Sequence, residues 1–116
     1  MRFPKEDVVQ LRHMVKAGRF AVSFIEGRTE NDVDADPMLA MALAKAIEVL
    51  GEAAYQLTDE TKRDIPNVPW DAIVNMRHRL VHAYNEVDFR IVYKTATVSI
   101  PDLLRIIGPV VDALEK

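Results

Sequence analysis

Apolar side chains recur every three or four residues along most of the chain, and this spacing limits the fold more than any other feature. One stripe between Lys5 and about Glu26 comprises Val8, Leu11, Val15, Val22 and Ile25, with Met14, Ala21 and Phe24 beside it. The same spacing predicts helices from Pro37 to about Leu57, from near Trp70 to about Val87, and from Asp88 onward. No segment shows the strict alternation of a strand. We therefore expect an all-α fold, an up-and-down bundle of four or five helices.

Cap and turn residues separate these helices. The segment 27–36 has little apolar content and predicts a polar loop, after which Asp36-Pro37 offers an N-cap followed by proline at the first helical position. Thr58 suggests a cap and a short turn of helix, and Pro66 and Pro69 enforce an extended connector. Pro101 lies inside the last helical pattern, where it either kinks one helix or divides it into two.

Length and composition narrow the class of protein. With 116 residues, 49% of them hydrophobic, we expect a single domain over residues 1–116. The absence of cysteine excludes disulfides, thiolate nucleophiles and cysteine-based metal sites. No apolar run approaches the roughly 18 residues of a membrane helix, and residues 1–7 show no long apolar stretch behind a basic start. We therefore expect a cytoplasmic protein without membrane contact. The net charge of −3 means that any contact with nucleic acid depends on a local basic cluster.

Such a cluster lies between Arg77 and Tyr84, which includes two of the three histidines and two arginines. It has an ordinary interpretation as a solvated basic face of a bundle helix. It also suits RNA hydrolysis without a metal, which needs a base for the 2′-hydroxyl proton, an acid for the leaving 5′ oxygen, and fixed positive charge for the phosphorane. Imidazole, with a reference pKa of about 6.5, can do the first two, and guanidinium suits the third.

Helical geometry complicates the second interpretation. At about 100° per residue, Arg77 and His82 lie roughly 140° apart around a regular helix, whereas His78 and His82 are separated by only about 40°. Three arrangements remain open. The long arginine side chain curls around the helix, the helix ends or bends near Val81, or a second subunit completes the site.

The pattern Arg77-x4-His82-x-Tyr84 resembles the R-x4-H-x-Y form of the HEPN ribonuclease motif, in the branch that contains HepT toxins. The resemblance extends beyond the motif. The segment 47–54 is similar to the family's helix with a Gly-Glu-Ala-Ala sequence, and 69–77 is similar to the family's Pro-Trp approach to the motif arginine. Val87-Asp88 and the late proline of 100–103 also stand where the family has them. The resemblance therefore covers nearly the whole chain.

This resemblance implies a HEPN-like helical bundle that forms a homodimer, with the two motifs facing each other across a cleft for RNA. It places Arg77 and His82 at the catalytic positions and Tyr84 at the position that a nucleotidyltransferase antitoxin modifies with adenylate. We expect His78 and Arg79 to contact the RNA substrate. The family usually has asparagine after the motif arginine, and this chain has His78 there. No metal or other cofactor is expected.

Other residues with chemical potential have structural interpretations. Glu48 and Glu52 lie one helical turn apart and could ligate a divalent ion, but an ion pair with an arginine of the motif helix, or simple solvation, is favoured. His13 is expected on the surface. Trp70 is expected in the core or in a dimer interface, and its use as a base-stacking platform is the alternative. The methionines are expected to fill the core.

The leading hypothesis is therefore a metal-independent endoribonuclease toxin that cleaves RNA by 2′-hydroxyl attack and is neutralised by adenylylation. A rival hypothesis from another class is a non-catalytic dimeric helical module that binds a nucleotidyltransferase or a nucleotide. The acidic net charge and His78 are the sequence features that favour the rival.

Overall fold

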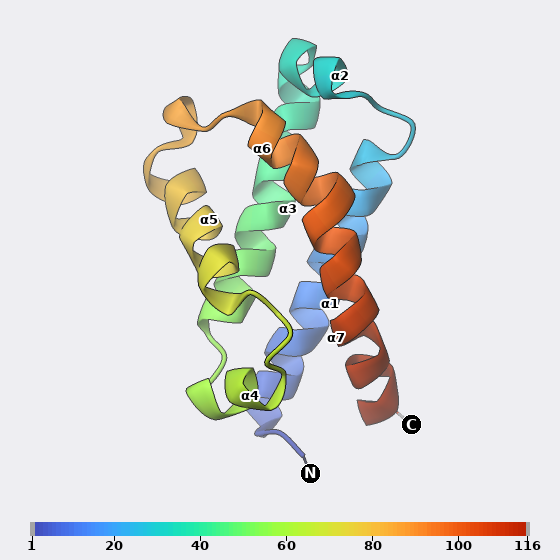
Figure 1. The fold of residues 1–116 in the computed structure, drawn as a ribbon, viewed down its shortest axis with the longest axis vertical. Helices are drawn as coiled ribbons and strands as arrows, with labels where there is room; N and C mark the ends of the chain where they lie inside the picture. Colours follow the sequence, from blue (N-terminus) through green and yellow to red (C-terminus); the bar gives the residue numbers. More distant parts are fainter. Residues whose placement is uncertain (1, 116) are drawn as a thin grey trace.

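The computed structural model describes residues 2–115, and within them every regular element is helical (Figure 1). The body consists of α1 (Lys5–Ile25), α3 (Pro37–Tyr55), α5 (Trp70–His82), and a continuous helical path through α6 (Phe89–Lys94), the π-helical turn η2 (Thr95–Ser99) and α7 (Ile100–Leu114). In Figure 1 each of these long segments runs opposite to the one before it, so both chain ends lie at the same end of the bundle. The prediction of an all-α fold is confirmed.

The core lies where α1 packs against α3 and α7, and where α3 packs against α5. Its most deeply buried large side chains include Leu11, Met14, Leu43, Val92 and Ile107. Burying each side chain of this size stabilises the fold by roughly 1.5–3 kcal/mol before entropy is counted. The assignment of the methionines to the core is right for Met14 but wrong for Met38 and Met41, which are 81% and 60% exposed.

The predicted caps form as expected. The side chain of Asp36 accepts hydrogen bonds from the backbone N–H groups of Met38 and Leu39 at the start of α3. Thr58 accepts one from Thr61 at the start of α4 (Asp59–Asp64). These bonds satisfy N–H groups that the first turn of a helix leaves without a partner, so both helices begin at defined residues.

The segment 27–36 is not wholly a loop, which corrects the sequence-based expectation. It contains α2 (Glu30–Ala35), which begins with a capping box in which Thr29 and Asp32 each accept a hydrogen bond from the other's backbone N–H. Val33 is the buried residue of this helix. One buried apolar side chain gives too little periodicity to reveal a six-residue helix, whereas the capping box was visible in the sequence.

Pro101 neither ends nor divides the last helix. The backbone stays in the right-handed helical region at Lys94, Thr95, Ser99 and Ile100, and the path widens into the π turn η2 just before the proline. A proline removes one backbone donor and crowds the preceding turn, and a π turn accommodates both effects without breaking the helix.

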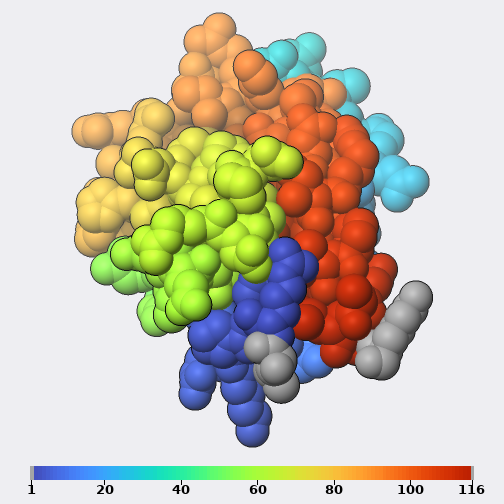
Figure 2. All heavy atoms as spheres, turned by 60° about the horizontal axis from the view of Figure 1, so that its bottom comes forward, coloured from blue at the N-terminus to red at the C-terminus, as the bar shows by residue number. Residues whose placement is uncertain are grey.

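The lower end of the bundle is closed by α4 and the connector that follows it. Figure 2 shows this part of the chain, in yellow-green, lying against the blue start of α1 and beside the orange-red α7. Trp70 is buried here, and its indole N–H donates to the backbone carbonyls of Lys62 and Ile65. The expectation of a core tryptophan is confirmed, and this anchor fixes where α5 begins.

Candidate active site

The basic cluster lies on α5 and just beyond it. The helix ends at His82, where Ala83 leaves the helical conformation with φ −142° and ψ 40°. A short 3₁₀ turn, η1 (Tyr84–Glu86), follows and leads into α6. Of the three arrangements that the sequence left open, an end of the helix near Val81 is therefore present. It places the last motif residue, Tyr84, outside the regular helix.

Arg77 turns toward α3. Its Nη2 lies 2.6 Å from Oε2 of Glu52, and its Cζ lies 5.6 Å from the ring centroid of Tyr55. Its side chain is 24% exposed, so the guanidinium sits in a partly desolvated position between the two helices. The ion pair between Glu52 and an arginine of the motif helix, favoured from the sequence over a metal site, is confirmed.

A glycine makes this approach of α3 and α5 possible. A β-carbon at Gly51 would overlap Cβ of Arg77 and lie 3.2 Å from the backbone carbonyl oxygen of Ile73. Gly51 therefore sets how closely the two helices pack beside the arginine. Neither Gly51 nor Tyr55 was identified as a site residue from the sequence, although both lie within one turn of Glu52.

The two histidines of the motif come together on a different side of α5. His78 and His82 are both exposed, and their ring centroids are 4.4 Å apart with the ring planes tilted by 54°. Arg79 is also exposed. Within one chain, the structure thus groups Arg77 with α3 and pairs His78 with His82 in solvent, as the separation of about 140° around a regular helix requires.

Tyr84 is half-buried at the end of the motif. Its ring meets Phe89 of α6 edge-on, with the centroids 6.1 Å apart and the planes at 65°. Asp88 caps α6 and is engaged by Arg90, whose hydrogen bonds hold the pKa of this carboxyl below its ordinary value. The carboxylate is thus paired with an arginine of the helix that it caps.

Carboxylates and histidines do not gather elsewhere as a multidentate metal site. Within residues 2–115, no group of three or more His, Cys, Asp or Glu side chains is placed to hold a metal ion. Oε1 of Glu48 lies 3.5 Å from Nζ of Lys45, a partner on its own helix and not on the motif helix. His13 is exposed on α1, as expected. In the described part of the chain, no helix is long and apolar enough to cross a membrane.

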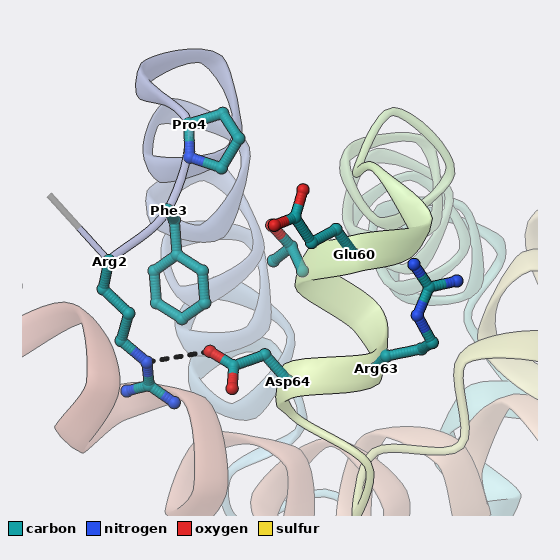
Figure 3. Close-up of a pocket in the computed structure, with 7 residues that line it drawn as sticks. Arg2, Phe3, Pro4, Glu60, Arg63 and Asp64 are labelled. Carbon is teal, nitrogen blue, oxygen red and sulfur yellow. Dashed lines mark hydrogen bonds and ion pairs between the residues drawn. The ribbon is translucent and has the colours of Figure 1, made fainter.

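A surface hollow at the other end of the bundle is unrelated to this cluster. It is lined by the segment 2–4 and by residues of α4, and the ion pair of Arg2 with Asp64 at 2.9 Å crosses it (Figure 3). Figure 1 places α4 at the opposite end of α5 from η1. The hollow is lined by no histidine, and one of its two carboxylates, Asp64, is paired with Arg2.

Comparison with known proteins decides the family. A profile described as Ribonuclease HepT-like matches residues 14–110, which include α3, the whole of α5 and Tyr84. The chain belongs to the HepT-like ribonuclease family. It is therefore an endoribonuclease, and the predicted resemblance to HepT toxins is confirmed.

Individual HepT-like relatives agree with this assignment. A protein of Caldanaerobacter subterraneus subsp. tengcongensis, named "Putative RNase", is 33% identical over 80% of this chain and 83% of its own length. A protein of Thermococcus cleftensis, named "Probable ribonuclease HepT", is 36% identical over 72% of this chain and 79% of its own length. No solved structure matches the chain significantly.

Proposed function

We propose that this HepT-like chain is a metal-independent endoribonuclease toxin acting in the cytoplasm, with residues 1–116 forming one catalytic domain. His82 acts as general acid or base, Arg77 stabilises the charge of the transition state, and His78 and Arg79 contact the RNA. The proposal rests on the different surroundings of Arg77 and His82 on α5. Arg77 is held in place by Glu52 and Tyr55, while His82 stands exposed at the last position of the helix.

The proposed reaction needs no external nucleophile. A base removes the proton of a ribose 2′-hydroxyl, the 2′ oxygen attacks the adjacent phosphorus, and the bond from phosphorus to the 5′ oxygen breaks as that oxygen takes up a proton. The products are a 2′,3′-cyclic phosphate and a 5′-hydroxyl. A guanidinium that is already oriented can stabilise the phosphorane without reorganising during the reaction.

A homodimer supplies the geometry that one helix lacks. Because Arg77 and His82 point in different directions from α5, a cleft between two copies can combine groups from both motifs around one phosphodiester. The family membership makes such a cleft the natural site for RNA, and it favours the nuclease over the non-catalytic module.

The exposed face of α3 fits a second copy of the chain. Met38, Met41 and Val49 are 81%, 60% and 41% exposed, and at 100° per residue they share one face of the helix with Glu52. Exposed apolar side chains of this size, gathered along one helix, favour a protein interface. Since the same face carries the carboxylate that holds Arg77, a partner docked here lies beside the proposed active site.

Regulation by a nucleotidyltransferase antitoxin is part of the proposal. Adenylylation of Tyr84 would place a bulky negative group two residues beyond His82, where it repels the phosphates of RNA and blocks the approach to the motif. Co-expression with such an antitoxin should add the mass of adenylate to the chain, and Tyr84→Phe should prevent this addition. The exposed Tyr55 provides the matched control, since Tyr55→Phe should leave the added mass in place.

The reaction is tested by its metal requirement and its products. Purified protein should cleave RNA in the presence of EDTA and leave 2′,3′-cyclic phosphate ends, which a phosphatase does not remove without prior acid treatment. Cleavage that stops in EDTA, or that leaves 3′-hydroxyl ends, would contradict the proposed chemistry.

A further inference from the structure

The imidazoles of His78 and His82 lie close enough together to bind a metal ion as well as to act on RNA. Both side chains are exposed, and they lie four residues apart on the last turns of α5, about 40° apart around the helix. Their ring centroids are 4.4 Å apart. Two accessible imidazoles at this spacing on one helical face are the arrangement with which helices bind zinc.

The distances fit a single small cation. Zinc binds imidazole nitrogen at about 2.0–2.1 Å, so two nitrogens in a tetrahedral site lie roughly 3–3.5 Å apart. Rings whose centroids are 4.4 Å apart and tilted by 54° reach this separation by rotation about the side-chain bonds, which exposure leaves free. The remaining coordination positions face solvent and can be filled by water.

The surrounding charges permit a cation here. Arg77 and Arg79 flank His78 in the sequence. The guanidinium of Arg77 turns away to α3, where its Nη2 lies 2.6 Å from Oε2 of Glu52. Arg79 is exposed, so its charge is screened by solvent and its flexible side chain can move away. Among residues 2–115 the site has only these two protein ligands, which predicts reversible binding and not a permanent structural metal.

We propose that His78 and His82 chelate a divalent transition-metal ion of the zinc class, and that this chelation inhibits the ribonuclease. The inhibitory part rests on the proposed function of His82. A metal on its ring nitrogen occupies the lone pair that a base needs to accept a proton and that an acid needs to carry one, so His82 is lost in either role. The HepT motif usually has asparagine at position 78, and asparagine has no imidazole. The pair therefore depends on His78, the residue at which this chain differs from the motif.

Binding is tested by calorimetric titration of tag-free, full-length protein with zinc chloride. The wild-type chain should bind one ion. His78→Asn and His82→Asn each remove a ligand and should weaken binding by at least the roughly 10–100-fold that loss of a supporting partner costs. His13→Asn is the matched control, because His13 is exposed on α1 and distant in sequence from the pair. Equal binding by His78→Asn and the wild type, or equal loss in His13→Asn, would overturn the site.

Inhibition is tested separately on RNA cleavage. With zinc at about ten times its dissociation constant, wild-type and His13→Asn proteins should retain roughly a tenth of their metal-free rates, and EDTA should restore them. His78→Asn is compared with its own metal-free rate and should lose much less at the same zinc concentration. Undiminished wild-type cleavage at saturating zinc would overturn the inhibitory role. If the protein cleaved no RNA at all, the proposed function would fail while the titration would still decide the metal site.

Discussion

Gly51 of α3 lies directly against Arg77 of α5, and no β-carbon fits between them. The first atom that a larger residue at position 51 would meet is Cβ of Arg77, and the next include its Cγ and the carbonyl oxygen of Ile73. The position of the arginine thus depends on the closest approach of two helices. This relationship connects helix packing to the proposed chemistry more directly than any other in the chain.

Gly51→Ala should therefore damage both stability and activity. The added methyl group must push α5 away from α3, which should lower the free energy of unfolding by about 1–3 kcal/mol and move Arg77 from its place beside Glu52. Gly108→Ala is the control, since a β-carbon there meets no atom within 4 Å and the helix propensity of alanine should make the change neutral or mildly stabilising. Urea denaturation and RNA cleavage would measure both effects. Equal stability of the two variants would contradict the packing argument.

Glu52→Gln should separate positioning from stability. The side chains of the Glu52–Arg77 pair are 44% and 24% exposed, so loss of the charge should cost less than about 1 kcal/mol of folding free energy. The substitution should nevertheless lower kcat by roughly tenfold or more, because it frees the guanidinium of Arg77 to move. Misplacing a catalytic group by about an ångström has effects of that order.

The neighbouring carboxylate provides the control for this change. Glu48 lies one turn earlier on α3 and pairs with Lys45 at 3.5 Å, so Glu48→Gln should leave kcat within about twofold of the wild type, as for surface changes generally. A rise in KM with kcat unchanged, or equal losses of kcat in the two variants, would show that Glu52 does not position Arg77.

Much of this architecture could be predicted from the sequence because local signals and packing agree. The periodicity of the long helices, the caps Asp36 and Thr58 and the buried Trp70 follow from side-chain chemistry within a few residues. The pairing of Glu52 with an arginine of the motif helix was also favoured. Each of these residue types strongly favours one structural role: Asp and Thr as helix caps, Trp in the core, and Glu as a partner for arginine.

Other features depend on tertiary distances that one sequence does not contain. The role of Gly51 exists only because α5 crosses α3 at that residue. A proline within a helical pattern does not reveal whether the helix kinks, divides or widens into a π turn, which is what the chain does at Thr95–Ser99. Met38 and Met41 were expected in the core because apolar content indicates which face is apolar but not whether another chain covers it. The short helix α2 lies below the length at which periodicity is informative.

Met41→Glu should disrupt the proposed dimer. A carboxylate on the exposed apolar face of α3 would be desolvated against a partner, whereas in a monomer it would remain in water. Sedimentation equilibrium should show a dimer for the wild type and a weaker dimer for this variant. Val98→Glu, which changes an exposed apolar residue of η2, should leave association unchanged. A wild-type monomer at all concentrations would contradict the proposed assembly.

Asp7 should make stability depend on pH below neutrality. Burial alone would raise the pKa of this carboxyl, but hydrogen bonds donated by the hydroxyls of Thr58 and Thr61 and by the backbone N–H of Thr58 hold it below its ordinary value. A lowered pKa in the folded state stabilises the protein above the unfolded carboxyl's pKa near 4, and this contribution is lost as the pH falls through the folded value.

Asp7→Asn should accordingly lower the free energy of unfolding by about 1–3 kcal/mol at pH 7, and the difference from the wild type should shrink at about pH 3. Urea denaturation at the two pH values measures it. The exposed Asp34 supplies a control, since Asp34→Asn should differ little from the wild type at either pH. A difference for Asp7→Asn that stays constant or grows in acid would show that the buried carboxylate does not have a lowered pKa.

The most direct test of the account is RNA cleavage in EDTA by Arg77→Ala and His82→Ala, beside Arg105→Ala and His13→Ala as controls on exposed arginine and histidine positions. Loss of one general acid or base should reduce the rate by about 10²–10⁴-fold, and loss of the phosphate-binding guanidinium by a comparable factor. Both controls should cleave at the wild-type rate. Undiminished cleavage by Arg77→Ala and His82→Ala would contradict the assignment of the active site to this end of α5.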